Sequence, residues 1–145
     1  MPGPTMTPLQ LEDSFFTALE TRANPAYQLP AEGGSRMPQP AVEPQIQMAR
    51  LEGEQKRYQL TLTVESSPAS EGDEPYRIHC QIVGQFVVDD AFENDDLDRL
   101  VAINGASILY SALREMVLLV TGRCAWGAVQ LPTVNFKHLD LQNDE

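Results

Sequence analysis

The feature that most constrains the fold is residues 108–123, ILYSALREMVLLVTGR, which read as most of a long helix that is apolar on more than one side. We expect this helix to begin at an acidic N-cap, Asp95 or Asp96, and to stop at Gly122. Its apolar positions follow two stripes. The first stripe consists of Leu97, Leu100, Val101, Asn104, Ile108, Ala112 and Met116. The second consists of Ile103, Tyr110, Leu113, Val117 and Val120.

A sheet of the same chain covers only one of these stripes, so the second predicts a contact with another protomer or with a client protein. We place Leu113 and Val117 in that oligomer interface. A charged residue at Leu113 is then expected to weaken the oligomer without unfolding the sheet. Gly105 inside the helix costs about 1 kcal/mol. It therefore predicts either a kink or a close crossing with another element.

Upstream of the helix, apolar residues alternate with polar ones in residues 45–51, 58–67 and 76–90, which predicts three strands. Residues 11–24 fit a helix or a strand, and we favour a strand with Phe15, Leu19 and Thr21 on one face. Gly84 indicates a bulge or a close backbone approach. Short links predict an antiparallel meander, whereas residues 28–44 form a long loop.

Composition limits the class of protein. A chain of 145 residues forms one domain, here residues 10–137, between a tail at residues 1–9 and an acidic tail at 138–145. Ten basic residues against 21 acidic ones give a net charge of −11, which disfavours nucleic acid and membrane partners. The N-terminus has no basic and apolar run typical of a signal peptide, and no membrane span is predicted. We therefore expect a cytoplasmic protein.

No pattern of catalytic or metal-binding residues is found. His79, His138, Cys80 and Cys124 lack the spacing of a metal site. The acidic residues 89–98 lack the glycine and the final glutamate of a calcium loop, so we interpret them as a solvated helix start. The sequence therefore predicts no cofactor and does not favour an enzyme.

Apolar side chains remain as candidate binding residues. Such residues belong more often to a core than to a binding surface, but the long loop and Trp126 favour an adaptable apolar groove for unfolded polypeptide. The candidate client-binding residues are Ile46, Met48, Phe86, Tyr110, Trp126, Val129 and Leu131. Phe136 lies in the same group of apolar residues.

Residues 104–136 carry a recognisable pattern. The helix contains Arg114-Glu115 and ends with Thr121-Gly122-Arg123, and the segment PTVNF, residues 132–136, follows. Together with the strands, this pattern resembles the SecB family of protein-export chaperones over residues 10–137.

The resemblance implies an α+β fold in which a four-stranded antiparallel sheet packs with one long C-terminal helix. It implies a homotetramer, a dimer of dimers, that binds unfolded clients without ATP. By the same resemblance, Ile78, Cys80 and Ile82 match the strand that mediates oligomer contacts, and Ile46 and Met48 match client-binding positions.

Two departures bear on the partner. At positions that match the family's docking residues for the SecA motor, this chain has Leu19, Ala23, Arg77 and His79, and its C-terminal tail is short. A basic residue and a histidine weaken an acidic docking patch. The sequence thus favours a solitary SecB-like chaperone, or one that guards an antitoxin in a toxin–antitoxin–chaperone system, over one that exports precursors through SecA.

Two classes of function follow. The main hypothesis is a holdase that keeps aggregation-prone polypeptide soluble. The alternative is an assembly adaptor that uses the same fold to bind one folded protein partner. Suppression of the aggregation of an unrelated protein distinguishes the two.

Overall fold

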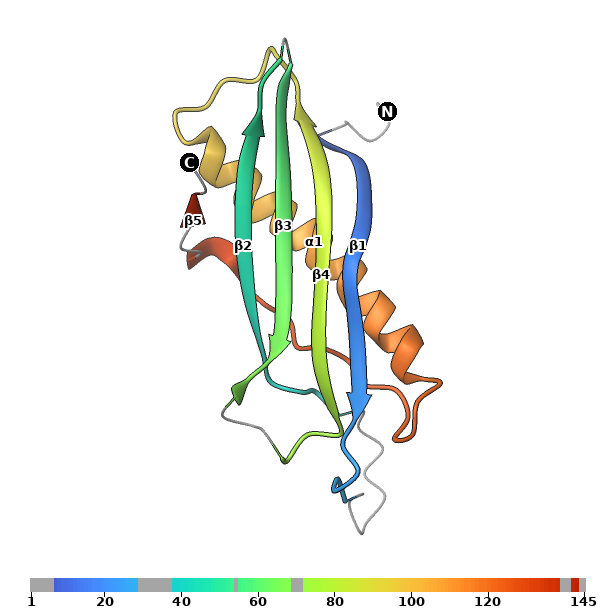
Figure 1. Cartoon of the computed structure of the whole chain (residues 1–145). Helices are drawn as coiled ribbons and strands as arrows, with labels where there is room; N and C mark the ends of the chain where they lie inside the picture. Colours follow the sequence, from blue (N-terminus) through green and yellow to red (C-terminus); the bar gives the residue numbers. More distant parts are fainter. Residues whose placement is uncertain (1–6, 29–37, 54, 69–71, 139–141, 144–145) are drawn as a thin grey trace, which may run out of the picture.

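The computed structural model describes residues 7–28, 38–53, 55–68, 72–138 and 142–143. It consists of one sheet with a long helix across one face (Figure 1). The four long strands are β1 (Leu9–Ala23), β2 (Val42–Leu51), β3 (Lys56–Ser66) and β4 (Tyr76–Val88). They are followed by α1 (Leu97–Thr121), a short 3-10 helix η2 (Phe136–His138) and β5 (Gln142–Asn143).

The strand order in the sheet is β1-β4-β3-β2-β5. Strands β2, β3 and β4 form the expected antiparallel meander, and β1 pairs antiparallel with β4. The predicted α+β, SecB-like fold is therefore confirmed. The short strand β5 adds a fifth member, parallel to β2, that the prediction did not contain, since two residues carry no alternation.

The alternation of apolar residues in β2, β3 and β4 places one apolar face toward α1, which we call the inner face. Tyr58, Leu60, Leu62 and Val64 are fully buried there, as the pattern in β3 predicts. The opposite or outer face carries polar residues such as Gln45, Thr63 and Gln81. The hydrophobic effect of burying the inner face against α1 therefore holds the two layers together.

Strand β1 corrects one prediction. Its pairing with β4 shifts register between Leu11 and Asp13 and again between Phe16 and Ala18, so β1 is bulged twice. As a result, Phe15 pairs with Val83 of the outer face, whereas Leu19 pairs with Cys80 of the inner face. The prediction that Phe15 and Leu19 share a face was wrong, because an extra residue reverses the alternation that follows it.

The helix occupies the predicted range. Its N-cap is Asp96, although the Asp96 side chain makes no capping hydrogen bond. Gly122 follows the last turn with helical dihedral angles, φ −60° and ψ −19°, so its role there is not the left-handed conformation usual for a glycine stop.

Two glycines let α1 approach the sheet closely. A Cβ atom on Gly84 of β4 would lie 2.6 Å from Leu109 Cδ2, and one on Gly105 of α1 would lie 2.6 Å from Leu60 Cδ2. Since α1 is continuous through Gly105, the close crossing rather than a kink explains this glycine. The close approach predicted at Gly84 is likewise found.

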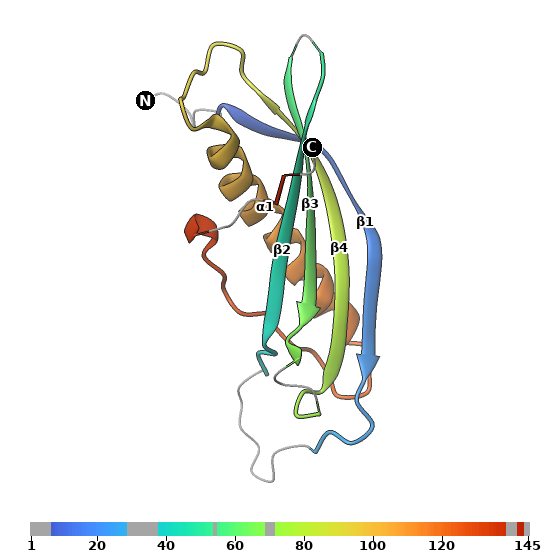
Figure 2. The same cartoon turned by 60° about the vertical axis from the view of Figure 1, so that its left-hand side comes forward.

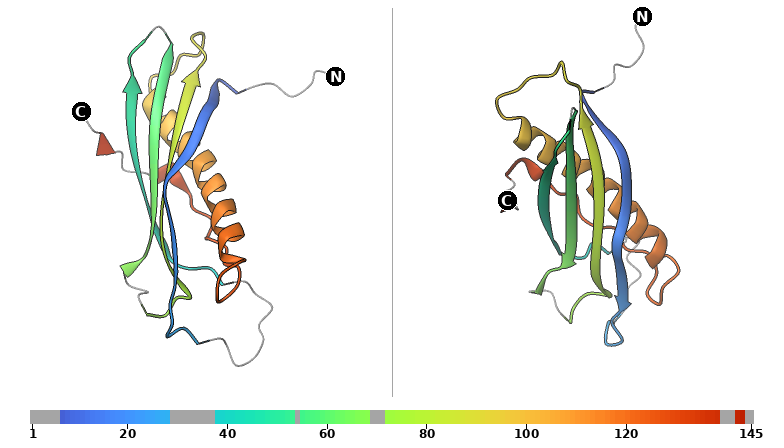
Figure 3. Two further views of the ribbon diagram at one scale, coloured as in Figure 1. Left: turned by 45° about the vertical axis from the view of Figure 1, so that its right-hand side comes forward. Right: turned by 45° about the horizontal axis from the view of Figure 1, so that its top comes forward.

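The chain after α1 turns back and runs along the helix on the inner side of the sheet (Figures 2 and 3). The Val129 amide donates to Thr121 Oγ1 at 3.0 Å, and the Tyr110 hydroxyl donates to the Pro132 carbonyl at 2.5 Å. Arg114 Nε donates to the Leu131 carbonyl at 3.1 Å. The PTVNF segment is thus tied to the helix that precedes it.

Trp126 connects the chain that follows α1, residues 122–138, which we call the return segment, to the end of β1. Its Nε1 donates to the Asn24 carbonyl at 2.9 Å, and its ring meets Tyr27 edge-on with centroids 5.4 Å apart. The Trp126 amide also donates to the Tyr76 hydroxyl, which donates in turn to the Gly127 carbonyl. These contacts fix both ends of the turn that follows α1.

Parts of the predicted tails and loop lie outside the described residues, namely 1–6, 29–37, 139–141 and 144–145. By length and composition alone, α1 could cross a membrane. In this structure one side of α1 packs on the inner face, with Ala102, Leu109 and Leu113 fully buried. A core helix of a folded domain meets the same criterion.

Candidate functional site

The predicted client-binding residues lie almost entirely in the core. Six of them are buried between the sheet, α1 and the return segment, and Trp126 is half-buried. The six are Ile46, Met48, Phe86, Tyr110, Val129 and Leu131. A client could reach them only if the helix or the return segment left the sheet, so their role in binding stays a prediction.

The predicted oligomer residues are buried in the same way. Leu113 and Val117 face the protomer's own sheet and are 0% exposed, and Ile78, Cys80 and Ile82 lie on the inner face. The accessible side of α1 instead includes Ile108 of the first stripe, which is 40% exposed, and Leu119, which is 61% exposed. In this structure the sheet of the same protomer covers the second stripe at Leu113 and Val117, and their place in an oligomer interface stays a prediction.

Exposed apolar side chains also follow β1. Leu11 is 40% exposed, Phe15 is 44% exposed and Leu19 is 39% exposed. Among the described residues, β1 is an edge strand of the sheet. Along its 15 residues, the edge that faces away from β4 has no paired strand. A long edge strand with apolar side chains is a surface that another chain can join.

A groove of about 440 Å³ lies between the start of β1, the end of β4 and the first turns of α1. Its lining is mainly apolar and includes Leu9, Val88, Phe92, Leu97, Leu100 and Ile108. Sequence reasoning missed this site because its residues come from three segments that show no common pattern. The only signal was the apolar stripe of Leu97, Leu100 and Ile108 that the sheet does not cover.

Acidic side chains follow the connection between β4 and the first turn of α1. They are Asp89, Asp90, Glu93, Asp95, Asp96 and Asp98. Four of them, Glu93, Asp95, Asp96 and Asp98, line a separate hollow together with Arg50 and Lys56. Lys56 Nζ donates to the Phe92 carbonyl at 2.9 Å, and the Tyr58 hydroxyl donates to Asp98 Oδ1 at 2.9 Å. A strongly acidic segment of this kind attracts polypeptide that carries basic residues.

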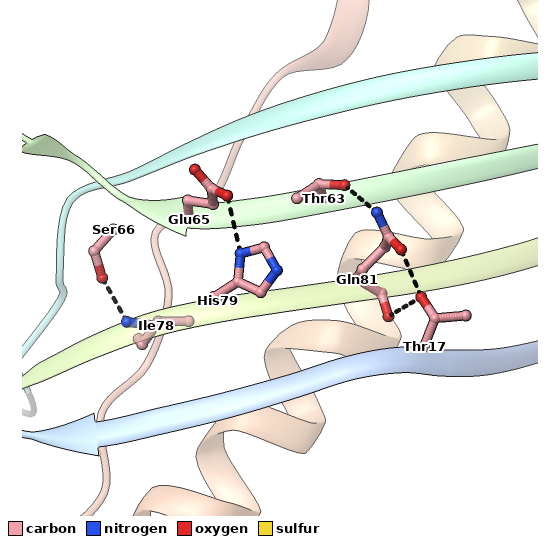
Figure 4. A network of polar contacts seen from close by, with 7 residues as sticks. All are labelled: Thr17, Thr63, Glu65, Ser66, Ile78, His79 and Gln81. Carbon is pink, nitrogen blue, oxygen red and sulfur yellow. Dashed lines mark hydrogen bonds and ion pairs between the residues drawn. The ribbon is translucent and has the colours of Figure 1, made fainter.

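The outer face of the sheet has a different character (Figure 4). Thr17 Oγ1 donates to Gln81 Oε1 at 2.7 Å, and Gln81 Nε2 donates to Thr63 Oγ1 at 3.0 Å. Further along the same face, His79 Nδ1 lies 2.9 Å from Glu65 Oε1. These polar contacts connect the three strands β1, β4 and β3 side by side on the outer face.

Titratable groups in the core are held in their neutral forms. Burial raises the pKa of Tyr58 to about 12, with a further contribution from its hydrogen bond to Asp98. Burial also raises the pKa of Tyr110 to about 12 and that of the Cys80 thiol to about 11. None of these groups is poised to react at neutral pH, and no group of three or more His, Cys, Asp or Glu residues in the described part of the chain could hold a metal ion.

Comparisons with known proteins agree with this fold. The family model described as preprotein translocase subunit SecB matches residues 20–145. A solved SecB-like chaperone of Mycobacterium tuberculosis, in complex with a ChAD peptide from the HigA1 antitoxin, superposes with a TM-score of 0.55 at 13% identity, covering 87% of this chain and 90% of that one. A Streptococcus agalactiae protein of unknown function superposes with a TM-score of 0.51 at 15% identity, covering 89% of this chain and 100% of that one. No curated protein matches the sequence.

Proposed function

Because the chain belongs to the SecB family, we propose that it is an ATP-independent holdase chaperone that binds unfolded or aggregation-prone polypeptide in the cytoplasm. The observation that carries this proposal is the apolar groove at the start of α1, with Ile108 exposed in it. A surface of this kind gains free energy by covering apolar side chains of many sequences.

Two kinds of client are compatible with this groove, and we favour an antitoxin. The peptide in the complex of the Mycobacterium tuberculosis chaperone supports that choice. Arg77 and His79 on the outer face also support it, since they stand where the family resemblance places acidic docking residues for SecA. Export of precursor proteins is the second possibility.

The proposal includes a homotetramer. Exposed Leu11, Phe15 and Leu19 on an open edge strand, together with Leu119 on α1, form apolar surface that a monomer would leave in water. Isologous pairing of such surfaces is the usual way for a chain to bury them.

The experiment is suppression of the aggregation of a chemically unfolded, unrelated protein, followed by light scattering. We expect the wild-type chain to suppress aggregation near one oligomer per client molecule without ATP. The variant Phe92→Ser/Leu100→Ser, which removes apolar side chains of the groove, should lose most of this effect. The matched control Leu51→Ser removes a half-buried apolar side chain at the end of β2, outside both the groove and the proposed oligomer contact, and it should retain the effect.

The outcome separates the hypotheses. A wild-type chain that leaves aggregation unchanged, but binds one folded protein from its source cell, would favour the assembly adaptor. Capture of native partners then distinguishes the clients: a single small antitoxin-like protein supports the antitoxin system, whereas many precursors together with SecA support export.

A further inference from the structure

Two arginines lie side by side on the outer face of the sheet. Arg22 of β1 is the direct cross-strand partner of Arg77 of β4, so their side chains leave the sheet on the same face. Both residues are exposed. Within the described part of the chain, neither makes a hydrogen bond or an ion pair.

Three other arginines have a specific acceptor in this structure. Arg57 pairs with Glu12 at 3.2 Å at the other end of the outer face, and Arg99 donates to the Lys137 carbonyl. Arg114 donates to the Leu131 carbonyl. In the described strands, Arg22 and Arg77 are the only two arginines that are direct cross-strand partners, in a chain with about twice as many acidic as basic residues.

This arrangement has an energetic cost. Like charges directly opposite each other on neighbouring strands destabilise a sheet. A carboxylate placed between the two guanidinium groups removes that repulsion and gains charge-assisted hydrogen bonds, which arginine can make in a bidentate manner. The two guanidinium groups are therefore placed to bind one carboxylate together.

The surroundings leave this point open. A hollow of about 620 Å³ lies at this end of the sheet, and its lining includes Arg22, Arg77, Glu20, Glu65 and His79. Glu65 is held by His79 at 2.9 Å (Figure 4), and Glu20 lies opposite His79 in the neighbouring row of the sheet. The arginines therefore form the outermost row, next to the ends of β1 and β4.

We propose that Arg22 and Arg77 together dock an acidic segment of a partner protein. The site lies on the sheet face opposite α1, whereas the client groove lies against α1, so both can be occupied at once. The net charge of −11 repels an acidic partner at long range. At physiological salt the Debye length is about 8 Å, so contacts with the two guanidinium groups dominate once the segment is in place.

The test is binding of a fluorescein-labelled peptide of alternating Asp, Glu and Gly residues, measured by anisotropy at 50 mM salt. The wild-type chain should bind it, and Arg22→Gln/Arg77→Gln should weaken binding at least tenfold. The control Arg57→Gln/Arg123→Gln removes the same charge from elsewhere on the chain and should change the affinity less than twofold. Both variants should keep the circular dichroism and the aggregation suppression of the wild type.

Three results would overturn the proposal: no peptide binding by the wild type, equal loss of binding in both double variants, or complete competition by a single-stranded RNA of equal charge. The last result would mean a general anion site rather than a protein docking point. A failure of aggregation suppression in the wild type would instead contradict the proposed chaperone function and leave this docking site unaffected.

Discussion

At the scale of single residues, Gly84 and Gly105 set how closely α1 approaches the sheet. Alanine at Gly84 would place a methyl group 2.6 Å from Leu109 and 2.8 Å from Phe86 side-chain atoms, in a core without room for it. Overpacking of this kind costs about 1–3 kcal/mol, which exceeds the gain of about 0.5–1 kcal/mol from replacing glycine in a strand. We expect Gly84→Ala to lower the free energy of unfolding by about 1–2 kcal/mol in urea titrations.

Gly122→Ala is the control for this prediction. The nearest atom to its added methyl group would be the Leu118 carbonyl oxygen at 3.4 Å, and its backbone is already helical. We expect this variant to be neutral or more stable by a few tenths of a kcal/mol, roughly the entropic gain of a compatible alanine. Equal loss of stability in both variants would show that the crossing is not tightly packed.

Residue-scale burial also predicts how stability depends on pH. Tyr58, Tyr110 and Cys80 have a raised pKa in the folded chain, of about 12, 12 and 11, against ordinary values of 10.0 for tyrosine and 9.0 for cysteine. The unfolded chain releases these protons first, so the stability they contribute is complete below pH 9 and is lost as the pH rises toward 12. The urea midpoint should therefore be level from pH 7 to 8.5 and then fall.

The variant Cys80→Ala checks the contribution of the thiol. It should be less stable than the wild type at pH 7, because it leaves a small cavity. Between pH 9 and 11 its urea midpoint should fall less steeply, since one titrating group is gone. An unchanged slope would assign the alkaline loss to the tyrosines alone.

At the scale of elements, α1 has one buried face and one accessible face, and two variants separate them. The Leu113 side chain is fully buried in the core, so Leu113→Ala should lower the free energy of unfolding by about 2–5 kcal/mol. Leu119→Ser acts on a side chain that is 61% exposed and should cost much less, yet it should lower the oligomer mass. Urea titration and light scattering of both variants give the answer, and an oligomer lost only in a folded Leu113→Ala would restore the original reading of that stripe.

Elements also show what sequence patterns can and cannot predict. Alternation located β2, β3 and β4 and their buried faces, because each strand has one face in water and one against α1. It could not locate the bulges of β1, which change the face of Phe15 relative to Leu19. It also could not tell which helix stripe the sheet covers, since both stripes are apolar and only the crossing at Gly84 and Gly105 decides between them.

At the scale of the whole molecule, the candidate site was harder to predict than the fold. The apolar residues chosen as client contacts, such as Phe86 and Leu131, are those that the core needs most, so hydrophobicity alone selected buried positions. The groove that the structure does expose joins the start of β1, the end of β4 and the start of α1. Segments so far apart in sequence come together only through the pairing of β1 with β4 across the whole intervening chain.

The open edge of β1 gives the last prediction. We expect a particle of about four times the 16.1 kDa chain mass in light scattering, because pairing of edges and helix faces covers Phe15, Leu19 and Leu119. Phe15→Lys places a charge in the proposed contact and should reduce the mass to that of a dimer or monomer, with circular dichroism unchanged. The control Gln10→Lys adds the same charge at another exposed position of β1 and should keep the wild-type mass. A stable wild-type monomer would contradict this prediction. It would mean that clients, rather than another protomer, cover the exposed apolar side chains of β1.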